Sequence, residues 1–459
     1  MSNAAIATSA PRVSRPGPIV SAARRAVLAR LSELDGGEIR LLDRATGTTH
    51  VAGRPGDLSA RIVIEDPRTY TQIASKGTLG AAEAYLEGWW TSDDLTAALR
   101  IFVRGLATTD QLERESSWWR RVGARVNHAL RRNDRAGSRR NISDHYDLGN
   151  DFFKLVLDET MTYSCGVFPR RGASLREASE AKLARLCEEL DLGPDDHLLE
   201  IGTGWGSCAI HAAKNYGCRV TTTTISDQQY EYARQRFQEE GVADQITLLK
   251  KDYRNLTGKF DKLVTIEMIE AVGHQYFDTF FEKCDQLLKA DGEMLMQAIT
   301  IVDHRFEHHK KTVDFIKQYI FPGGCLPSVT ALSQSMARQS RLRLVHMEDF
   351  ASHYAETLRR WRNDFLENLN EVRRLGFDDR FIRIWDYYLC YCEAAFMERH
   401  VNVTQLWFAN HAAKASPVDR NIHSVPQRKV EQTRQRQTET QKECTHDDSQ
   451  SVGTSEVAV

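Results

Sequence analysis

The chain has 459 residues, a formal net charge of −2 and a composition that is 41% hydrophobic, with 8 Trp and 18 Phe. The length allows two or three domains, the apolar content allows real hydrophobic cores, and the near-zero charge argues against a protein dominated by nucleic-acid binding. The 9 cysteines are scattered without a Cys-x-x-Cys pair, which indicates neither a disulfide framework nor a zinc site and fits a reducing, cytosolic setting.

The N-terminal part predicts a flexible leader at residues 1–22, followed by a small α+β domain at residues 23–108. An amphipathic helical pattern, two apolar strand patterns and two further helical patterns make up this domain. They are expected near residues 27–34, 38–42, 60–64, 80–90 and 93–103. Ser92, just ahead of two aspartates, is the expected N-cap of the last helix.

Residues 109–140 differ in character from their surroundings and predict a linker. Between residues 114 and 140 the chain carries nine arginines, no lysine and only two acids, with Trp118 and Trp119 at one end. A solvated linker is the ordinary interpretation of such a segment. A patch for anionic lipid is the alternative, because basic residues are attracted to a charged leaflet and Trp favours the interface. A nucleic-acid patch is a third possibility, but no nucleic-acid-binding motif accompanies it.

Residues 141–412 alternate between strand and helix patterns, which predicts an α/β fold with a doubly wound, mostly parallel sheet. Strands are expected at residues 197–202, 218–224, 245–249, 261–266 and 293–299, and helices at 176–191, 207–216, 227–241 and 275–289. An insertion at residues 300–330 and two aromatic-rich helices within 353–400 follow. Residues 413–459 are rich in Gln, Thr, Arg and Ser and predict a disordered tail.

A glycine-rich loop follows the first strand of this region, in the stretch Glu200-Ile-Gly-Thr-Gly-Trp-Gly206. Glycines at 202, 204 and 206 allow a sharp turn and let the backbone lie against a ligand at a strand-to-helix switch. The spacing is one residue shorter than the dinucleotide Gly-x-Gly-x-x-Gly motif. With Glu200 just ahead, the loop predicts a nucleoside site of the S-adenosylmethionine type, in a Rossmann-like methyltransferase fold.

The second strand ends without the carboxylate that dehydrogenases place beside a ribose. Thr224, Ser226 and Gln229 are the expected hydrogen-bonding partners there, and Asp252 and Tyr253, after the third strand, are expected to contact adenine. The missing acid and the shortened glycine spacing argue against a dinucleotide-dependent oxidoreductase. A non-enzymatic lipid-binding or scaffold protein remains an alternative. Failure to bind S-adenosylmethionine would favour it.

Several further motifs complete a resemblance to a known family. They are Asn141-Ile-Ser-Asp-His-Tyr-Asp-Leu-Gly-Asn150, Met161-Thr-Tyr-Ser-Cys-Gly-Val-Phe168, Thr224-Ile-Ser-Asp-Gln-Gln229, Met268-Ile-Glu-Ala-Val-Gly273 and Tyr319-Ile-Phe-Pro-Gly-Gly-Cys-Leu-Pro-Ser328. With the glycine loop, they resemble the cyclopropane-fatty-acyl-phospholipid synthase family, which includes mycolic acid cyclopropane synthases. The resemblance covers about residues 30–410. It implies that S-adenosylmethionine donates a methyl group to the cis double bond of a phospholipid acyl chain.

Such a reaction needs three things of the protein. An alkene is a weak nucleophile, so the sulfonium must be held close and in line. The carbocation that results needs anionic or π-electron stabilisation and the exclusion of water. Closing the ring then requires a base to remove a proton from the transferred methyl group.

The resemblance implies that this base is a bound bicarbonate. The residues that match the bicarbonate cradle are Cys165, Glu270, Gln297, Ile299 and Tyr354, and Tyr163 and Ser164 join the cofactor site. Gln297 replaces the family's histidine, and a glutamine donates a hydrogen bond but carries no positive charge. Glu267 is a rival carboxylate three positions before Glu270, and the motif match favours Glu270.

Each cradle residue also has an ordinary structural interpretation. Cys165 alone would be a small buried packing residue, Glu270 a helix cap, and Tyr354 a core residue of an amphipathic helix. His145 and His274 are expected to be structural hydrogen bonders. The aromatic residues of the late helices are expected to be mainly core, with some lining an acyl tunnel; they are Trp361, Phe365, Trp385, Tyr387, Tyr388, Tyr391 and Phe396.

The sequence therefore predicts a cytoplasmic methyltransferase, peripheral on the inner membrane surface, that builds a cyclopropane in unsaturated phospholipid. No secretory signal and no run of about 18 apolar residues accompanies it, so contact with a membrane would be peripheral. Gln297 keeps a second outcome open, a C-methyltransferase giving a methyl-branched or methylene chain. The expected partners are the phospholipid surface and a second copy in a homodimer, with no nucleic acid and no metal.

Overall fold

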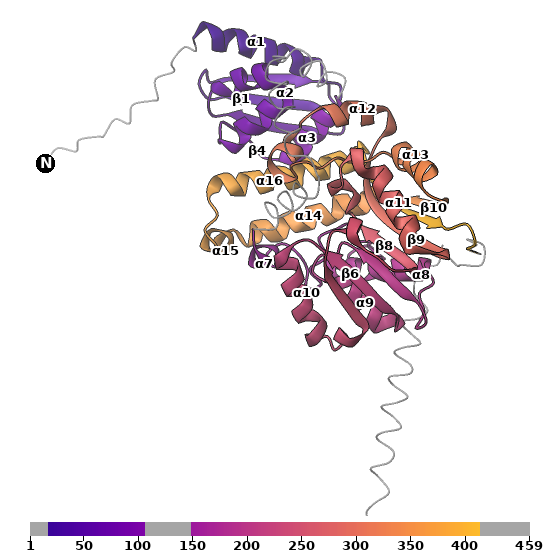
Figure 1. Cartoon of the computed structure of the whole chain (residues 1–459). Coiled ribbons are helices and arrows are strands. Elements are labelled where there is room, and N and C mark those ends of the chain that lie inside the picture. Colours follow the sequence, from indigo (N-terminus) through magenta and orange to yellow (C-terminus); the bar gives the residue numbers. More distant parts are fainter. Residues whose placement is uncertain (1–16, 106–147, 414–459) are drawn as a thin grey trace, which may run out of the picture. The chain divides into compact units, whose positions relative to one another are not determined.

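The computed structural model describes residues 17–105 and 148–413, and these described residues belong to one compact unit (Figure 1). Residues 1–16 of the predicted leader, the predicted arginine-rich linker at 109–140 and the predicted tail from residue 414 lie outside the described residues. The same holds for His145.

The N-terminal region folds into a four-stranded sheet of order β2-β1-β3-β4 with three helices. Its elements are α1 (Pro18–Ser32), β1 (Glu38–Asp43), β2 (Thr48–Gly53), β3 (Ser59–Ile64), α2 (Arg68–Leu86), β4 (Trp90–Ser92) and α3 (Leu95–Arg104). Strand β1 pairs in parallel with β3, while β1–β2 and β3–β4 are antiparallel. The predicted α+β character of this region is confirmed.

Three details of the N-terminal prediction are wrong. Helix α1 begins at Pro18, inside the predicted leader, because Pro fits the first turn of a helix, where its missing N–H costs nothing. Helix α2 begins at Arg68 and breaks at Gly77, so only its second half was foreseen. The N-cap of α3 is Asp94 rather than Ser92, since the Asp94 carboxylate accepts a hydrogen bond from Ala97 N at 2.8 Å.

The larger sheet has seven strands in the order β10-β11-β9-β8-β5-β6-β7. They are β5 (His197–Ile201), β6 (Arg219–Thr224), β7 (Ile246–Lys250), β8 (Phe260–Ile266), β9 (Leu288–Ile301), β10 (Arg343–Asp349) and β11 (Val401–Ala409). Strands β7, β6, β5, β8 and β9 are parallel to one another, whereas β11 is antiparallel to both β9 and β10. The predicted α/β class with a doubly wound, mostly parallel sheet is confirmed; β10 and β11 were not predicted.

Helices connect and cover these strands (Figure 1). They are α7 (Asn150–Phe153), α8 (Leu175–Glu189), α9 (Ser207–Tyr216), α10 (Asp227–Glu239), α11 (Phe277–Leu287), α12 (Asp303–Lys311), α13 (Val329–Gln339), α14 (Ala351–Glu367), α15 (Leu369–Arg374) and α16 (Asp379–Met397). Helix α8 starts with a capping box in which Ser174 and Glu177 exchange side-chain-to-backbone hydrogen bonds. Helices α11 and α13 share one core with the sheet.

The strand order creates the place for a site. Strand β5 lies between β6 and β8, so the connections that leave its two neighbours run to opposite sides of the sheet. A crevice opens at the carboxyl edge of such a switch point. Strand β9, next to β8, ends at the same edge because the pair is parallel.

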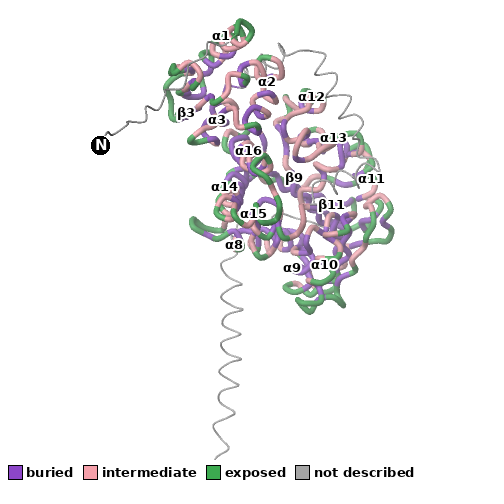
Figure 2. Tube along the Cα trace, turned by 90° about the vertical axis from the view of Figure 1, so that its left-hand side faces the viewer, coloured by how far each residue is buried: buried purple, intermediate pink, exposed green. Residues whose placement is uncertain are grey.

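Burial follows this arrangement. Strands β9 and β11 are buried along most of their length, while exposed residues gather on the outer turns of α10 (Figure 2). The late helices α14 and α16 are largely core, as predicted, and Trp361, Phe365 and Trp385 are all at most 2% exposed. These two helices therefore contribute large buried aromatic side chains to the core.

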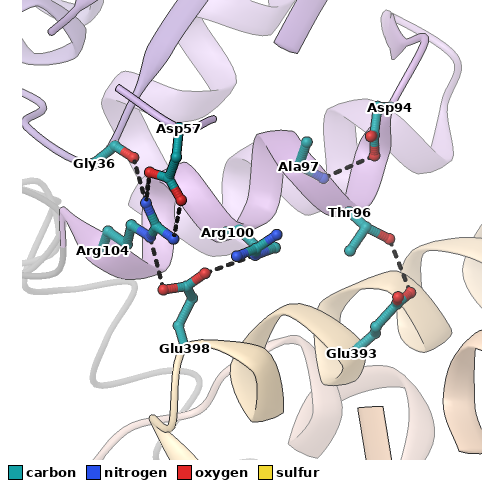
Figure 3. Close-up of polar contacts among 9 residues, drawn as sticks. All are labelled: Gly36, Asp57, Asp94, Thr96, Ala97, Arg100, Arg104, Glu393 and Glu398. Atoms are coloured by element: carbon teal, nitrogen blue, oxygen red, sulfur yellow. Dashed lines mark hydrogen bonds and ion pairs between the residues drawn. The ribbon is translucent and has the colours of Figure 1, made fainter. Parts of the chain in front are cut away.

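Helix α3 of the N-terminal region packs against α16 through a charged cluster (Figure 3). Glu398 accepts hydrogen bonds from Arg100 Nε at 2.6 Å and from Arg104 Nε at 2.7 Å, and Arg104 also binds Asp57. A second contact joins Thr96 to Glu393 at 3.1 Å. Burial alone would raise the pKa of Glu398, but the two arginines outweigh it and hold this pKa below the usual range.

Replacing Glu398 with Gln is expected to lower the free energy of unfolding by about 1–3 kcal/mol, because two partly buried guanidinium groups lose their carboxylate. The difference from the wild type should shrink as the pH falls through the lowered pKa of Glu398, where the carboxylate becomes protonated in the parent too. Thermal and urea unfolding measure it. Glu231→Gln, which breaks the exposed pair with Arg234 on α10, is the matched control and should change stability by less than about 0.5 kcal/mol. An equal effect of the two variants would contradict the assignment.

Candidate active site

A cavity of about 380 Å³ opens at the carboxyl edges of β5, β6, β8 and β9. One part is lined by the glycine loop and the ends of β5 and β6, and another by apolar and aromatic residues of the late helices. Of the predicted cofactor-binding residues, the cavity is lined by Tyr163, Ser164, Glu200, Gly202, Gly204, Thr224, Gln229, Asp252 and Tyr253. Gly206 and Ser226 are not among its lining residues.

The glycine loop divides into two roles. Gly202 and Gly204 have φ values of 105° and 52° and line the cavity, and space for a ligand remains in front of Gly204 because an added Cβ would meet nothing within 4 Å. Gly206, with φ 93°, is the residue before α9, and a Cβ there would approach Phe237 Cε1 to 2.7 Å. It therefore serves the close packing of α9 against α10 rather than contact with a ligand.

Glu200 stands at the end of β5 as a buried carboxylate. It accepts a hydrogen bond from Thr222 Oγ1 at 2.5 Å, and burial raises its pKa to about 7. Lys182, from α8, also lines the cavity with 0% exposure and donates to Ser164 Oγ at 2.8 Å. Burial lowers the pKa of this ammonium while the nearby carboxylates oppose the fall, so the lysine balances part of their negative charge.

The end of β6 is polar without being acidic, as predicted. Thr224 Oγ1 donates to Gln229 Oε1 at 2.9 Å, and both residues line the cavity. Ser226 is instead the N-cap of α10, because its hydroxyl accepts from Gln229 N at 3.3 Å. The predicted ribose contact of Ser226 is thus replaced by a structural role that holds Gln229 in place.

Asp252 and Tyr253 follow β7 and both line the cavity. Asp252 is held by a paired contact with Arg254, at 2.8 Å and 2.6 Å. The hydroxyl of Tyr253 is buried without a hydrogen-bond partner among the described residues. An unpartnered buried polar atom beside an open pocket fits the polar edge of a nucleoside, so this set of residues fits S-adenosylmethionine.

The carboxylate of Glu267 gathers hydrogen bonds from three of the five residues predicted to hold an anion. Its Oε1 accepts from Cys165 N at 2.9 Å and from Gln297 Nε2 at 2.8 Å, and its Oε2 accepts from Tyr354 Oη at 2.6 Å. Cys165 contributes its backbone N–H, because its thiol is fully buried and donates to Gly166 O. These three donors therefore face Glu267 rather than Glu270, the residue that the motif match favours.

Gln297 is oriented by a chain of amides that starts at an arginine. Arg185 Nε donates to Gln405 Oε1 at 3.1 Å, and Gln405 Nε2 donates to Gln297 Oε1 at 3.0 Å. A guanidinium only donates, so it fixes the direction of both amides. The Gln297 NH₂ group consequently faces Glu267.

Glu270 has a different environment from Glu267. Its Oε1 accepts from Ile299 N, while its Oε2 is buried without a partner among the described residues. Burial, followed by the negative charge of Glu267, raises the pKa of Glu270 to about 8. Burial also raises the pKa of Glu267, but its three hydrogen-bond donors oppose that rise, so Glu267 is the better stabilised of the two as an anion.

The residues present do not fit a bound bicarbonate. The backbone N–H groups of Cys165 and Ile299, the amide of Gln297 and the hydroxyl of Tyr354 all donate to protein carboxylates already. A further anion would find these donors taken and two carboxyl groups beside it. Like charges at such a site oppose binding.

An aromatic wall faces the carboxyl groups. Tyr163 Oη and Tyr388 Oη are 3.0 Å apart, and the ring of Tyr354 stacks on that of Phe396 with centroids 4.5 Å apart. All four residues line the cavity, and its apolar part is completed by Ile299, Ile316, Phe321, Tyr391, Leu358 and Val401. Some residues of the late helices thus line the apolar part, as expected, whereas Trp361, Phe365, Trp385 and Tyr387 do not.

The sequence did not indicate Lys182 or Gln405 as site residues, and it ranked Glu267 below Glu270 as the carboxylate of the site. Lys182 lies in a helical pattern where a lysine is normally a solvated residue, and Gln405 lies in an unpredicted strand. For Glu267 the available signal was a carboxylate directly after an apolar strand. His274, expected to be structural, is not among the cavity residues.

Comparisons with known proteins agree with this geometry. A family model described as mycolic acid cyclopropane synthetase matches residues 133–406. The tuberculostearic acid methyltransferase UfaA1 of Mycobacterium tuberculosis is 37% identical over 73% of this chain and 79% of its own length, and the cyclopropane-fatty-acyl-phospholipid synthase of Escherichia coli is 35% identical over 77% and 89%. The crystal structure of mycolic acid cyclopropane synthase CmaA1 complexed with SAH and CTAB superposes with a TM-score of 0.56 at 30% identity, covering 59% of this chain and 98% of that one.

The free energy of unfolding should depend on pH because the pKa of Glu270 is raised in the folded chain. Between about pH 4.5 and pH 8 the unfolded chain loses this proton while the folded chain keeps it, so the free energy of unfolding should fall as the pH rises, by at most about 1.4 kcal/mol per pH unit. Glu270→Gln removes that slope, and urea unfolding across this range measures it. Glu239→Gln, an exposed glutamate on α10, is the control for the loss of one carboxylate. Parallel curves for the wild type and Glu270→Gln would contradict the assignment.

Proposed function

The chain belongs to the mycolic acid cyclopropane synthetase family and is an S-adenosylmethionine-dependent methyltransferase acting on lipid acyl chains, and we propose that its substrate is the cis double bond of an unsaturated phospholipid. The proposed product is a cyclopropane ring. The proposal rests mainly on one cavity. The part lined by the glycine loop and the part lined by apolar residues both lie next to carboxyl groups.

The chain's own residues suit this chemistry. S-adenosylmethionine supplies an electrophilic methyl group. The glycine loop and the polar ends of β5 and β6 would hold the nucleoside, and the apolar walls would hold an acyl chain and exclude water. The rings of Tyr163, Tyr354 and Tyr388, together with the Glu267 carboxylate, would stabilise positive charge that develops on the alkene.

A second product has support of its own. The relative UfaA1 is named a tuberculostearic acid methyltransferase, and Gln297 stands where the family's histidine is expected. The same methyl transfer followed by a different loss of a proton gives a methylene chain, and reduction of that chain gives a methyl branch. A C-methyltransferase on the same lipids is therefore the second candidate.

We also propose that the enzyme reaches its substrate by peripheral contact with a phospholipid surface. Within residues 17–105 and 148–413, no helix is both long and apolar enough to span a bilayer. An acyl chain buried in a leaflet requires the enzyme to come to it. The arginine-rich segment with Trp118 and Trp119 is the candidate contact.

Mass spectrometry and NMR of lipids from cells that express the chain test the product. Cyclopropane formation predicts acyl chains heavier by one methylene group, with ring protons in the NMR spectrum and no alkene signal. A methylene product has the same mass gain but keeps alkene protons, and it would favour the second candidate. The matched control is Gly204→Val, which obstructs the cofactor loop at a positive φ. Phospholipids unchanged by the wild type would contradict the proposed substrate.

Vesicle sedimentation tests the membrane contact. Replacing Arg131, Arg132, Arg139 and Arg140 together with Gln should weaken binding to anionic phospholipid vesicles, at a cost of roughly 1 kcal/mol per residue. Added salt should weaken wild-type binding in parallel, because it screens the same attraction. Equal sedimentation of the wild type and the variant at low salt would contradict the proposed contact and indicate that this segment is an ordinary linker. Replacing four exposed arginines of the described part together with Gln, namely Arg234, Arg338, Arg341 and Arg374, is the charge-matched control.

A further inference from the structure

We propose that Glu267 is the chain's own catalytic base and takes the place of the bicarbonate that the family resemblance implies. The inference rests on the proposed function, because it concerns the proton that leaves after methyl transfer. The enzyme would then need no dissolved anion for turnover, and the base would be part of the polypeptide.

The hydrogen bonds around Glu267 are those of an anion site that is already filled. Cys165 N, Gln297 Nε2 and Tyr354 Oη converge on its two oxygens at 2.6–2.9 Å. The side chain is only half-buried because it faces the cavity, so it is enclosed by donors and still accessible to a bound substrate. A carboxylate and a bicarbonate present similar oxygens, and one can replace the other in such a cradle.

The backbone at Glu267 is held in an unusual conformation to achieve this. Glu267 has φ 50°, in the left-handed region that residues with a Cβ seldom occupy. Its N–H bonds to Gln297 O at 2.8 Å, directly after β8 ends. Backbone strain of this kind persists where the surrounding structure enforces it, commonly at functional sites. Here it turns the carboxylate toward the cradle.

Burial raises the pKa of Glu267, and its hydrogen-bond donors together with Lys182 oppose that rise and favour the carboxylate. The groups that face it are Glu270 from the turn after β8, Lys182 from α8, Tyr354 from α14, Tyr388 from α16 and the Cys165 thiol. Burial raises the pKa values of Glu270, of the two phenols and of the thiol, which favours their neutral forms. Lys182 donates its hydrogen bond to Ser164 and favours the Glu267 carboxylate through its charge.

The step assigned to Glu267 is a simple proton transfer. After methyl transfer the acyl chain bears a positive charge on the other former alkene carbon, next to the carbon that carries the new methyl group. A Glu267 oxygen takes one proton from that methyl group, and the C–H electron pair forms the last bond of the ring and neutralises the cation. Loss of the same proton after a hydride shift gives the methylene product, so the base serves both candidate products. The proton later passes from Glu267 to water, and no oxidant or reductant is consumed.

The first test compares turnover in buffer freed of carbon dioxide with turnover in added bicarbonate, measured as formation of S-adenosylhomocysteine with unsaturated phospholipid vesicles. The wild type should show equal rates in both. Glu267→Gln keeps the size and the acceptor oxygen but cannot take a proton, and its kcat should fall by roughly 100-fold or more. Its affinity for S-adenosylmethionine should stay within about twofold of the wild type, since the base contributes to a proton transfer and not to cofactor binding. Glu393→Gln, another buried glutamate that lies away from the cavity, is the matched control and should keep its rate.

The second test uses Glu267→Gly, which empties the cradle and accepts the positive φ without strain. This variant should be inactive without bicarbonate and regain activity, with saturation, when bicarbonate or formate is added. A purely structural role for Glu267 predicts no such rescue. Dependence of the wild type on bicarbonate, or full activity of Glu267→Gly without it, would overturn the inference.

Anion binding separates this inference from the proposed function. Titration with ¹³C-bicarbonate, followed by NMR, requires no lipid and no turnover. The wild type should not bind and Glu267→Gly should bind, with circular dichroism confirming that both are folded. Binding by the wild type would overturn the inference even if the lipid chemistry is right. If Glu267→Gly binds bicarbonate and the wild type does not, but the wild type does not turn over phospholipid, only the proposed substrate is rejected.

Discussion

The convergence of three hydrogen-bond donors on one half-buried carboxylate governs this site. A carboxylate inside a protein is costly unless its oxygens are satisfied, and Cys165, Gln297 and Tyr354 satisfy those of Glu267. The three donors come from a loop, strand β9 and helix α14, which are far apart in the sequence. Their meeting point therefore ties the sheet edge to the aromatic helices and defines where a reacting group can be placed.

The fold supplies the remaining constraints. Parallel strands bring the glycine loop after β5 and the carboxylates after β8 to one edge, while the antiparallel strand β11 inserts Gln405 beside Gln297. Arg185 then fixes the direction of both amides. Because burial and the charge of Glu267 raise the pKa of Glu270, the cavity favours a single negative charge on this pair, opposite the aromatic rings. That combination suits a reaction that passes through a cation.

Much of this could be predicted from the sequence, where local patterns determine the outcome. The strands β5 to β9 and the helices between them follow periodicity and turn chemistry, and the glycine loop follows its spacing. Strands β10 and β11 were missed because they lie next to an aromatic-rich helical region, and their pairing depends on contacts distant in sequence. Motif matching identified four of the residues that donate hydrogen bonds at this site, namely Cys165, Gln297, Ile299 and Tyr354. It favoured Glu270 over Glu267, because the sequence does not show which of two carboxylates three residues apart a donor faces.

A crystal structure of the chain grown in bicarbonate with S-adenosylhomocysteine tests the central claim most directly. The account predicts density for the Glu267 carboxylate within hydrogen-bond distance of Cys165 N, the Gln297 amide and the Tyr354 hydroxyl, with no separate anion between them. A triangular anion held by these donors, with the Glu267 side chain turned away, would contradict it.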